Sequence, residues 1–230
     1  MPTSMGTVMG NCQQLLSLLH LSSPALPVGG FAYSQGLESA IELGWVKDRA
    51  TMVDWLSGIL SQGMSNLELP VMRRMVFALA GEDSRSIQYW NQFLFACRES
   101  HELQFEDQQV GEALRRLLLS LEITGVDRLP KPASYALMFC SAVQHWDIDI
   151  EAALSGFCWS WLENQVAVAC KTIPLGQTDG QKIMMSMKKQ IEVAIERSAV
   201  LEDDQLGVSL PGLAIASALH ETQYSRLFRS

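Results

Sequence analysis

The chain has 230 residues, of which 48% are hydrophobic and 18% are Asp, Glu, Lys or Arg. A chain of this length can build one substantial core. Soluble proteins average about 25% charged residues, so the low charge here leaves a surplus of apolar residues that a partner interface can cover. The formal net charge is −8, and the 17 basic residues are scattered along the sequence. Binding to nucleic acid needs a concentrated basic patch, so the composition argues against such a partner.

The hydropathy pattern and the cysteines indicate a cytoplasmic protein. No apolar run reaches the roughly 18 to 20 residues of a membrane span, and the first residues lack the basic start of a secretory signal. The five cysteines are odd in number, lie among apolar neighbours and have no Cys-x-x-Cys spacing. We therefore expect reduced, buried thiols, with neither disulfides nor a zinc site.

Apolar residues recur with a helical period along most of the chain. Three examples are the sets Met52, Leu56, Ile59 and Leu60; Leu114, Leu117, Leu118 and Leu121; and Ile183, Met187, Ile191 and Ile195. Candidate N-cap residues are Asp48, for a helix to about Gly63, and Ser84 and Asp147 for two later helices. Pro and Gly clusters separate about eight to ten helices in all.

The pattern predicts an all-α fold, a single-domain helical bundle that spans residues 1–230. No linker, tandem repeat or low-complexity tract divides the chain. We expect residues 1–10 to form a flexible leader and residues 220–230 to form an arm that binds a partner.

The least ordinary segment is SSPALPVGGFAYSQGLE, residues 22–38, which we call the Pro-Gly loop. Its prolines and glycines interrupt a helix, yet Leu26, Val28 and Phe31 are more apolar than a solvated loop requires. Two interpretations stay open: the loop packs into its own core, or it meets another protein. It is not a phosphate loop, because Lys-Ser/Thr does not follow the glycines and no strand precedes them.

A second unusual segment, WSWLENQVAVACKTIPLGQTDG, covers residues 159–180. Its first part is apolar around most of the helix circumference, which indicates a central helix. Lys171 stands near the end of this helix. It either emerges at the edge of the buried surface or serves as a partner contact, and a cation there also suits the negative end of the helix dipole.

The residue types that carry chemistry form no local site. The four histidines are scattered, and HExxH, Glu-x-x-His pairs and Gly-x-Ser-x-Gly are all missing from the sequence. We therefore predict no catalytic residue, no metal ligand and no tightly bound cofactor. The alternative is a helical enzyme whose small-molecule pocket is assembled from distant residues.

The last twenty residues, PGLAIASALHETQYSRLFRS, begin as a helix of small residues and end in an arm rich in aromatic and Arg residues. Chain ends are usually polar, whereas aromatic residues and Arg are enriched in interface hot spots. The arm therefore docks either on its own domain or on a partner.

Together these segments resemble the UreF family of urease accessory proteins. The resemblance is carried by LSSPALPVGGFAYSQGLE, by ACRES at residues 96–100, by WSWLENQVAVACKTIPLGQTDGQ and by IASALHETQYSRLFRS, and it covers residues 15–230. It implies an all-helical homodimer that performs no chemistry and binds UreD, called UreH in some organisms. That pair recruits the nickel-carrying GTPase UreG, which this chain is expected to regulate.

The resemblance also implies a cargo and a set of contact residues. The assembly would dock on apo-urease and deliver Ni²⁺ to its dinickel site, so only a transient passage of Ni²⁺ is expected. Tyr33 and Lys171 are similar to positions on the surface that serves UreG. The arm resembles the part that orders against UreD, which implies contacts from His220, Glu221, Tyr224, Arg226, Phe228 and Arg229.

Overall fold

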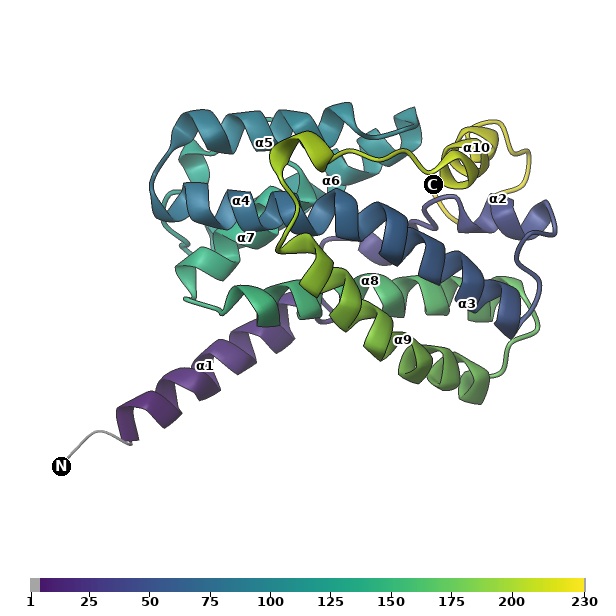
Figure 1. Cartoon of the computed structure of the whole chain (residues 1–230), viewed down its shortest axis with the longest axis horizontal. Helices are drawn as coiled ribbons and strands as arrows, with labels where there is room; N and C mark the ends of the chain where they lie inside the picture. The colour runs from purple at the N-terminus through teal and green to yellow at the C-terminus, as the bar shows by residue number, and fades with distance from the viewer. Residues whose placement is uncertain (1–4, 230) are drawn as a thin grey trace.

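The computed structural model describes residues 5–229, and side chains from residue 11 onward. The described residues contain no strand, which confirms the all-α prediction, and the number of helices falls in the expected range (Figure 1). The α-helices are α1 Met5–Leu21, α2 Leu37–Glu42, α3 Arg49–Gly58, α4 Glu68–Ala80, α5 Ser84–Ala96, α6 His101–Ser120, α7 Tyr135–His145, α8 Ile150–Thr172, α9 Gln177–Ser198 and α10 Pro211–His220.

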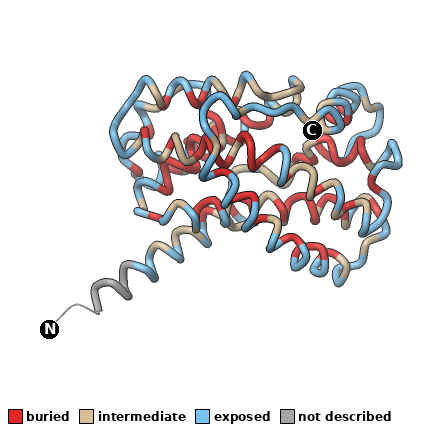
Figure 2. The backbone as a smooth tube through the Cα atoms, in the orientation of Figure 1, coloured by how far each residue is buried: buried red, intermediate tan, exposed pale blue. Residues whose placement is uncertain are grey.

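The helices pack around one hydrophobic core. Helix α8 contacts α9, α2, α1 and α4, while α7 packs between α4 and α6. Figure 2 shows the buried residues concentrated along the inner faces of these helices. The buried apolar side chains form one cluster that extends from Leu21 at the end of α1 to Phe228 in the C-terminal arm. Such continuity is what a single core would produce.

The helix starts follow from local side-chain chemistry. Asp48 caps α3 as predicted, with a capping box in which its carboxylate accepts the Thr51 N–H. The predicted caps Ser84 and Asp147 are wrong. Asp83 caps α5 one residue earlier, and Asp149 caps α8, because these carboxylates reach the free N–H groups of the first turn.

Helix α3 continues without a break into a π-helix, Ile59–Gly63, and then a 3-10 turn, Met64–Asn66, before α4 begins. The helix expected to end near Gly63 is therefore an α-helix followed by a π-helical segment. Packing favours glycine at position 63, because a Cβ there would lie only 2.8 Å from Cδ1 of Leu210. The segment before α10 thus lies directly against the wider π-helical turn.

The expectation that all the cysteine thiols are buried is wrong. All five are free thiols, but only Cys140 and Cys158 are buried; Cys97 and Cys170 are half-buried and Cys12 is exposed. Burial raises the pKa of the Cys158 thiol to about 12, so this thiol stays protonated and unreactive at neutral pH. Apolar neighbours in the sequence did not guarantee burial, because helix ends and outward faces also carry apolar residues.

Two further expectations concern the chain's ends and its surroundings. Residues 5–10, expected to belong to a flexible leader, form the first part of α1, and residues 1–4 lie outside the described part of the chain. Within residues 5–229, none of the helices combines the length and apolar character that a membrane span requires.

Candidate functional site

The C-terminal arm, residues 220–230, is described up to Arg229 and folds back on its own domain (Figure 1). The carboxylate of one glutamate binds two of its backbone N–H groups. Glu38, in α2, accepts backbone N–H groups from Leu227 at 2.8 Å and from Phe228 at 3.0 Å. Glu38 is buried, and hydrogen bonds to a charged acceptor are stronger than those to a neutral one. The arm's path over α2 is therefore fixed by this residue.

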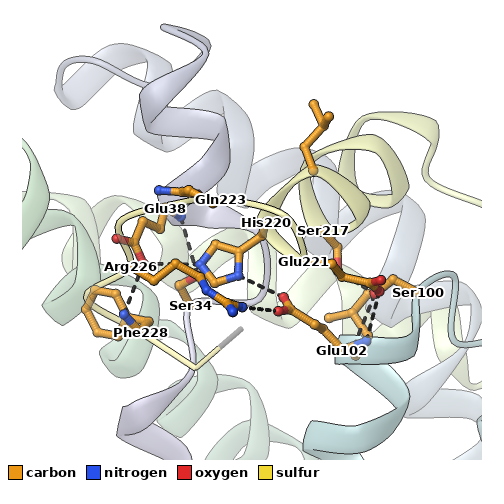
Figure 3. Close-up of polar contacts among 12 residues, drawn as sticks. Ser34, Glu38, Ser100, Glu102, Ser217, His220, Glu221, Gln223, Arg226 and Phe228 are labelled. Carbon is orange, nitrogen blue, oxygen red and sulfur yellow. Dashed lines mark hydrogen bonds and ion pairs between the residues drawn. The ribbon is translucent and has the colours of Figure 1, made fainter.

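His220 links the same carboxylate to α6, as Figure 3 shows. Its Nε2 lies 3.2 Å from Glu38 Oε2, and its Nδ1 lies 2.8 Å from Glu102 Oε2. The His220 side chain is 0% exposed. Each ring nitrogen of His220 therefore contacts a different carboxylate, one from α2 and one from α6.

Glu102 extends this network along the arm. Its Oε1 accepts a hydrogen bond from Arg226 Nη1 at 2.6 Å, while its own backbone N–H donates to Glu221 at 3.2 Å. Beside it, the Ser100 and Ser217 hydroxyls lie 2.5 Å apart. We call Glu38, Glu102, His220 and Arg226 the arm clasp. The clasp ties α2, α6, α10 and the arm together.

Glycine at position 36 permits the close approach of α2 and α10 beneath the clasp. Gly36 has φ +77°, and a Cβ there would lie 3.0 Å from the backbone nitrogen of Ser217. A larger residue would be strained by the left-handed conformation and would also push α10 away. The clasp geometry thus depends on a residue that takes no part in its hydrogen bonds.

The structure brings Lys171 and the arm together, although the sequence assigned them to different partners. Phe228 is buried, and Nζ of the exposed Lys171 lies 5.6 Å from the centroid of its ring, within range of a cation–π contact. The next residue, Arg229, donates its backbone N–H to the Ala32 carbonyl at 2.8 Å. The arm, the end of α8 and the Pro-Gly loop therefore form one continuous region.

Tyr33 does not lie on the surface of this chain. Its side chain is 4% exposed, and its carbonyl accepts a hydrogen bond from Asn164 Nδ2 at 3.0 Å. The expectation of a surface position for Tyr33 is wrong for the chain on its own, because the loop turns its Tyr33 and Leu26 side chains into the core. Part of the loop therefore packs into its own core, while Pro24 and Pro27 remain exposed, and contact of the loop with another protein stays a prediction.

The predicted arm residues divide by exposure. His220 and Phe228 are buried and hold the arm in place, whereas Glu221, Arg226 and Arg229 are exposed on it. Tyr224 is fully exposed, and Leu227 is 73% exposed. The exposed apolar residues Ile215 and Leu219 of α10 lie in the same part of the chain. Sequence reasoning assigned no role to Glu38 or Glu102, and no local signal marks them, because their partners are more than a hundred residues away.

A cavity of about 190 Å³ lies between the Pro-Gly loop, α6 and α8. Arg98 borders it and pairs with Asp107 at 2.8 Å and with Glu68. Burial opposes the charge on Arg98, but the two carboxylates outweigh burial and raise its pKa above the ordinary value. Among the described residues, no group of three or more His, Cys, Asp or Glu side chains could hold a metal ion. Three of the charged residues that line the cavity, Arg98, Asp107 and Glu68, are therefore paired with one another.

Comparison with known proteins assigns the family. The UreF family model matches residues 46–188. Proteins named urease accessory protein UreF are 49% identical over 217 residues in Chromohalobacter salexigens, covering 94% of both chains, and 47% identical over 231 residues in Marinobacter nauticus, covering 100% of both. A protein of the same name from Pseudoalteromonas translucida is 48% identical over 221 residues, again covering 94% of both chains. The chain belongs to the UreF family of urease accessory proteins.

Proposed function

We propose that this chain is a non-enzymatic scaffold in urease maturation, which links UreD to the GTPase UreG. The observation that carries the proposal is the docked arm, which presents exposed Tyr224 and Leu227 on a base fixed by the arm clasp. Tyr is enriched in interface hot spots, and an arm whose backbone is already docked loses less conformational entropy on binding than a free arm would. This surface is proposed to receive UreD.

Lys171 is the residue that we propose for contact with UreG. It is an exposed cation, and its contact with Phe228 places it beside the arm. Tyr33 is buried here, so a direct role toward UreG requires a rearrangement of the Pro-Gly loop when the complex forms. The chain would regulate the GTPase through this region.

The remaining parts of the proposal are the cargo, the oligomeric state and the compartment. Ni²⁺ is proposed to pass transiently on its way to apo-urease, without a tight site in this chain. The chain would act in the cytoplasm as a homodimer. The family assignment and the names of the relatives, which describe urease accessory proteins, support this role.

Co-purification tests the scaffold. The chain is expressed with and without UreD and UreG, and each mixture is analysed by size exclusion with mass detection. We expect a complex with UreD, and UreG to join only when both other proteins are present. Tyr224→Ser combined with Leu227→Ser should weaken UreD binding by at least tenfold, because the pair forms the apolar tip of the arm.

The matched control is Phe77→Ser, which changes an exposed aromatic residue of α4 outside the arm. It should bind UreD like the wild type. The Lys171→Ala variant should still bind UreD but should no longer bind UreG. A chain that forms no complex in any mixture would refute the scaffold. Full UreD binding by the Tyr224→Ser, Leu227→Ser variant would show that the arm is not part of the UreD interface.

A further inference from the structure

The cavity beside Arg98 has walls from parts of the chain that are remote in sequence. The Pro-Gly loop, α6 and α8 contribute to it, and residues 206–210, the segment before α10, add Val208 and Leu210. The backbone N–H of Leu210 donates to Glu99 Oε1 at 2.8 Å, which fixes this segment against the end of α5. The cavity therefore exists only in the assembled fold, and no local sequence pattern reveals it.

The size and the lining of the cavity suit one small ring-shaped molecule. Its volume is about 190 Å³, and most of its lining is apolar, including the aromatic residues Phe31, Tyr135, Phe157 and Trp161. An apolar protein cavity of about 150 Å³ takes up benzene. A single ring with a short polar arm therefore fits this cavity, whereas a nucleotide or a peptide is too large for it.

The charges in the wall favour a cation. Among the described residues, the lining contains one cationic side chain, Arg98, and four carboxylates, those of Glu68, Glu99, Glu106 and Asp107, which leaves a formal charge of −3. Arg98 already pairs with two of these carboxylates, so it is not available to an anionic ligand. Coulomb attraction is stronger inside a protein than in water, and aromatic rings also attract cations. The wall therefore attracts an ammonium group and repels a carboxylate.

A buried acceptor in the wall points to the same chemistry. Asn164 of α8 lines the cavity and is 8% exposed. Its Nδ2 donates to the carbonyls of Tyr33 at 3.0 Å and Gly30 at 3.4 Å, whereas its Oδ1 is buried without a hydrogen-bond partner. A buried acceptor without a donor costs stability. The group that the wall lacks is a donor, and an ammonium group carries three.

We propose that this cavity is a reversible binding site for a small primary amine with an apolar ring. The ring would lie among the aromatic residues of the lining, and the ammonium group would face the carboxylates. An occupied cavity would hold the Pro-Gly loop, α6 and α8 together. The inference goes beyond the proposed scaffold and does not depend on it, because the site is formed within one chain.

Three ligands that share one ring and differ in charge test the inference: benzylamine, benzyl alcohol and benzoate. In calorimetric titration of the full chain, benzylamine should bind with a Kd on the order of 1 mM. Benzyl alcohol should bind about tenfold more weakly, and benzoate should not bind measurably. Benzylamine should also shift the NMR signal of the Trp161 indole N–H, which donates to Gln35 Oε1 at 2.9 Å in the wall.

Two results of this titration would overturn the inference. One is the absence of benzylamine binding at about 10 mM, ten times the expected Kd. The other is benzoate binding as tight as benzylamine binding. The titration uses this chain alone, so its outcome is separate from the test of the scaffold with UreD and UreG.

Variants of the wall locate the bound ligand. Ser160→Leu places a larger side chain in the lining and should weaken benzylamine binding about tenfold, because it fills part of the cavity. The matched control is Ser155→Leu, the same substitution at an exposed position of α8 outside the lining, and it should bind like the wild type.

Glu99→Gln removes one negative charge from the wall and preserves the size of the side chain. It should weaken benzylamine binding about fivefold and leave the affinity for benzyl alcohol unchanged. This variant keeps the test valid even where the larger side chain of Ser160→Leu unfolds the domain. Benzylamine binding at wild-type strength by Glu99→Gln and by a folded Ser160→Leu would place the ligand outside the cavity and overturn the inference.

Discussion

Replacement of Glu38 by Gln should release the C-terminal arm. The substitution preserves the size of the side chain and removes its charge, while one of its two oxygens becomes an NH₂ group that cannot accept. Glu38 accepts two backbone N–H groups and faces His220 Nε2. A hydrogen bond to a charged group contributes about 1.5 to 3 kcal/mol, against about 1 kcal/mol for a neutral pair. Across three contacts, the arm loses on the order of 3 kcal/mol of docking free energy.

Hydrogen exchange measures this loss directly, because the Leu227 and Phe228 amides are the groups that Glu38 binds. Each 1.4 kcal/mol is a factor of ten, so their exchange should accelerate about a hundredfold in Glu38→Gln. Glu42→Gln is the matched control, since Glu42 is the exposed last residue of α2. Equal exchange rates at both amides in the wild type and Glu38→Gln would refute the clasp.

Three further substitutions and one control, Gly58→Ala, test a buried ion pair, the packing at a glycine and the cap of α3. Arg98→Met leaves the buried Asp107 and the half-buried Glu68 without their shared cation and should lower the free energy of unfolding by about 3 to 5 kcal/mol in urea denaturation. Gly111→Ala brings a Cβ to 2.1 Å from the Ala133 carbonyl oxygen and should lower the free energy of unfolding by about 1 to 3 kcal/mol or more. In the control Gly58→Ala, the added Cβ meets nothing within 4 Å, so this substitution should not destabilise the fold. Hydrogen bonds from Thr51 lower the pKa of Asp48 below 3.8, so its contribution is present above that pH and is lost as the pH falls through the lowered pKa. Asp48→Ala should therefore lower Tm at pH 7, and the difference should narrow as the pH falls from 3.8 through the lowered pKa.

The sequence predicted the features that local chemistry determines. The all-α fold follows from periodicity, the α3 cap from Asp48, and the family from long, unusual segments. Lys171 is exposed at the end of α8, as its position before Pro174 suggests.

The clasp could not be predicted, because its partners are remote in sequence. Glu38 and His220 are 182 residues apart, and neither lies in a pattern that reveals the other. His220 was expected to contact a partner, which stays a prediction, and in the chain on its own it is fully buried between two carboxylates. Tyr33 was expected on the surface because of the resemblance to the UreF family, but Asn164 of α8 binds its carbonyl and the side chain is buried. Tertiary packing decided both positions.

The nickel content of urease tests the central claim most directly. Urease is purified from cells that produce UreD, UreG and the urease subunits, with or without this chain, and its nickel is measured by mass spectrometry. We expect a filled dinickel site only when the chain is present, and a much lower content with the Tyr224→Ser, Leu227→Ser variant. Equal nickel contents with and without the chain would contradict a role in urease maturation.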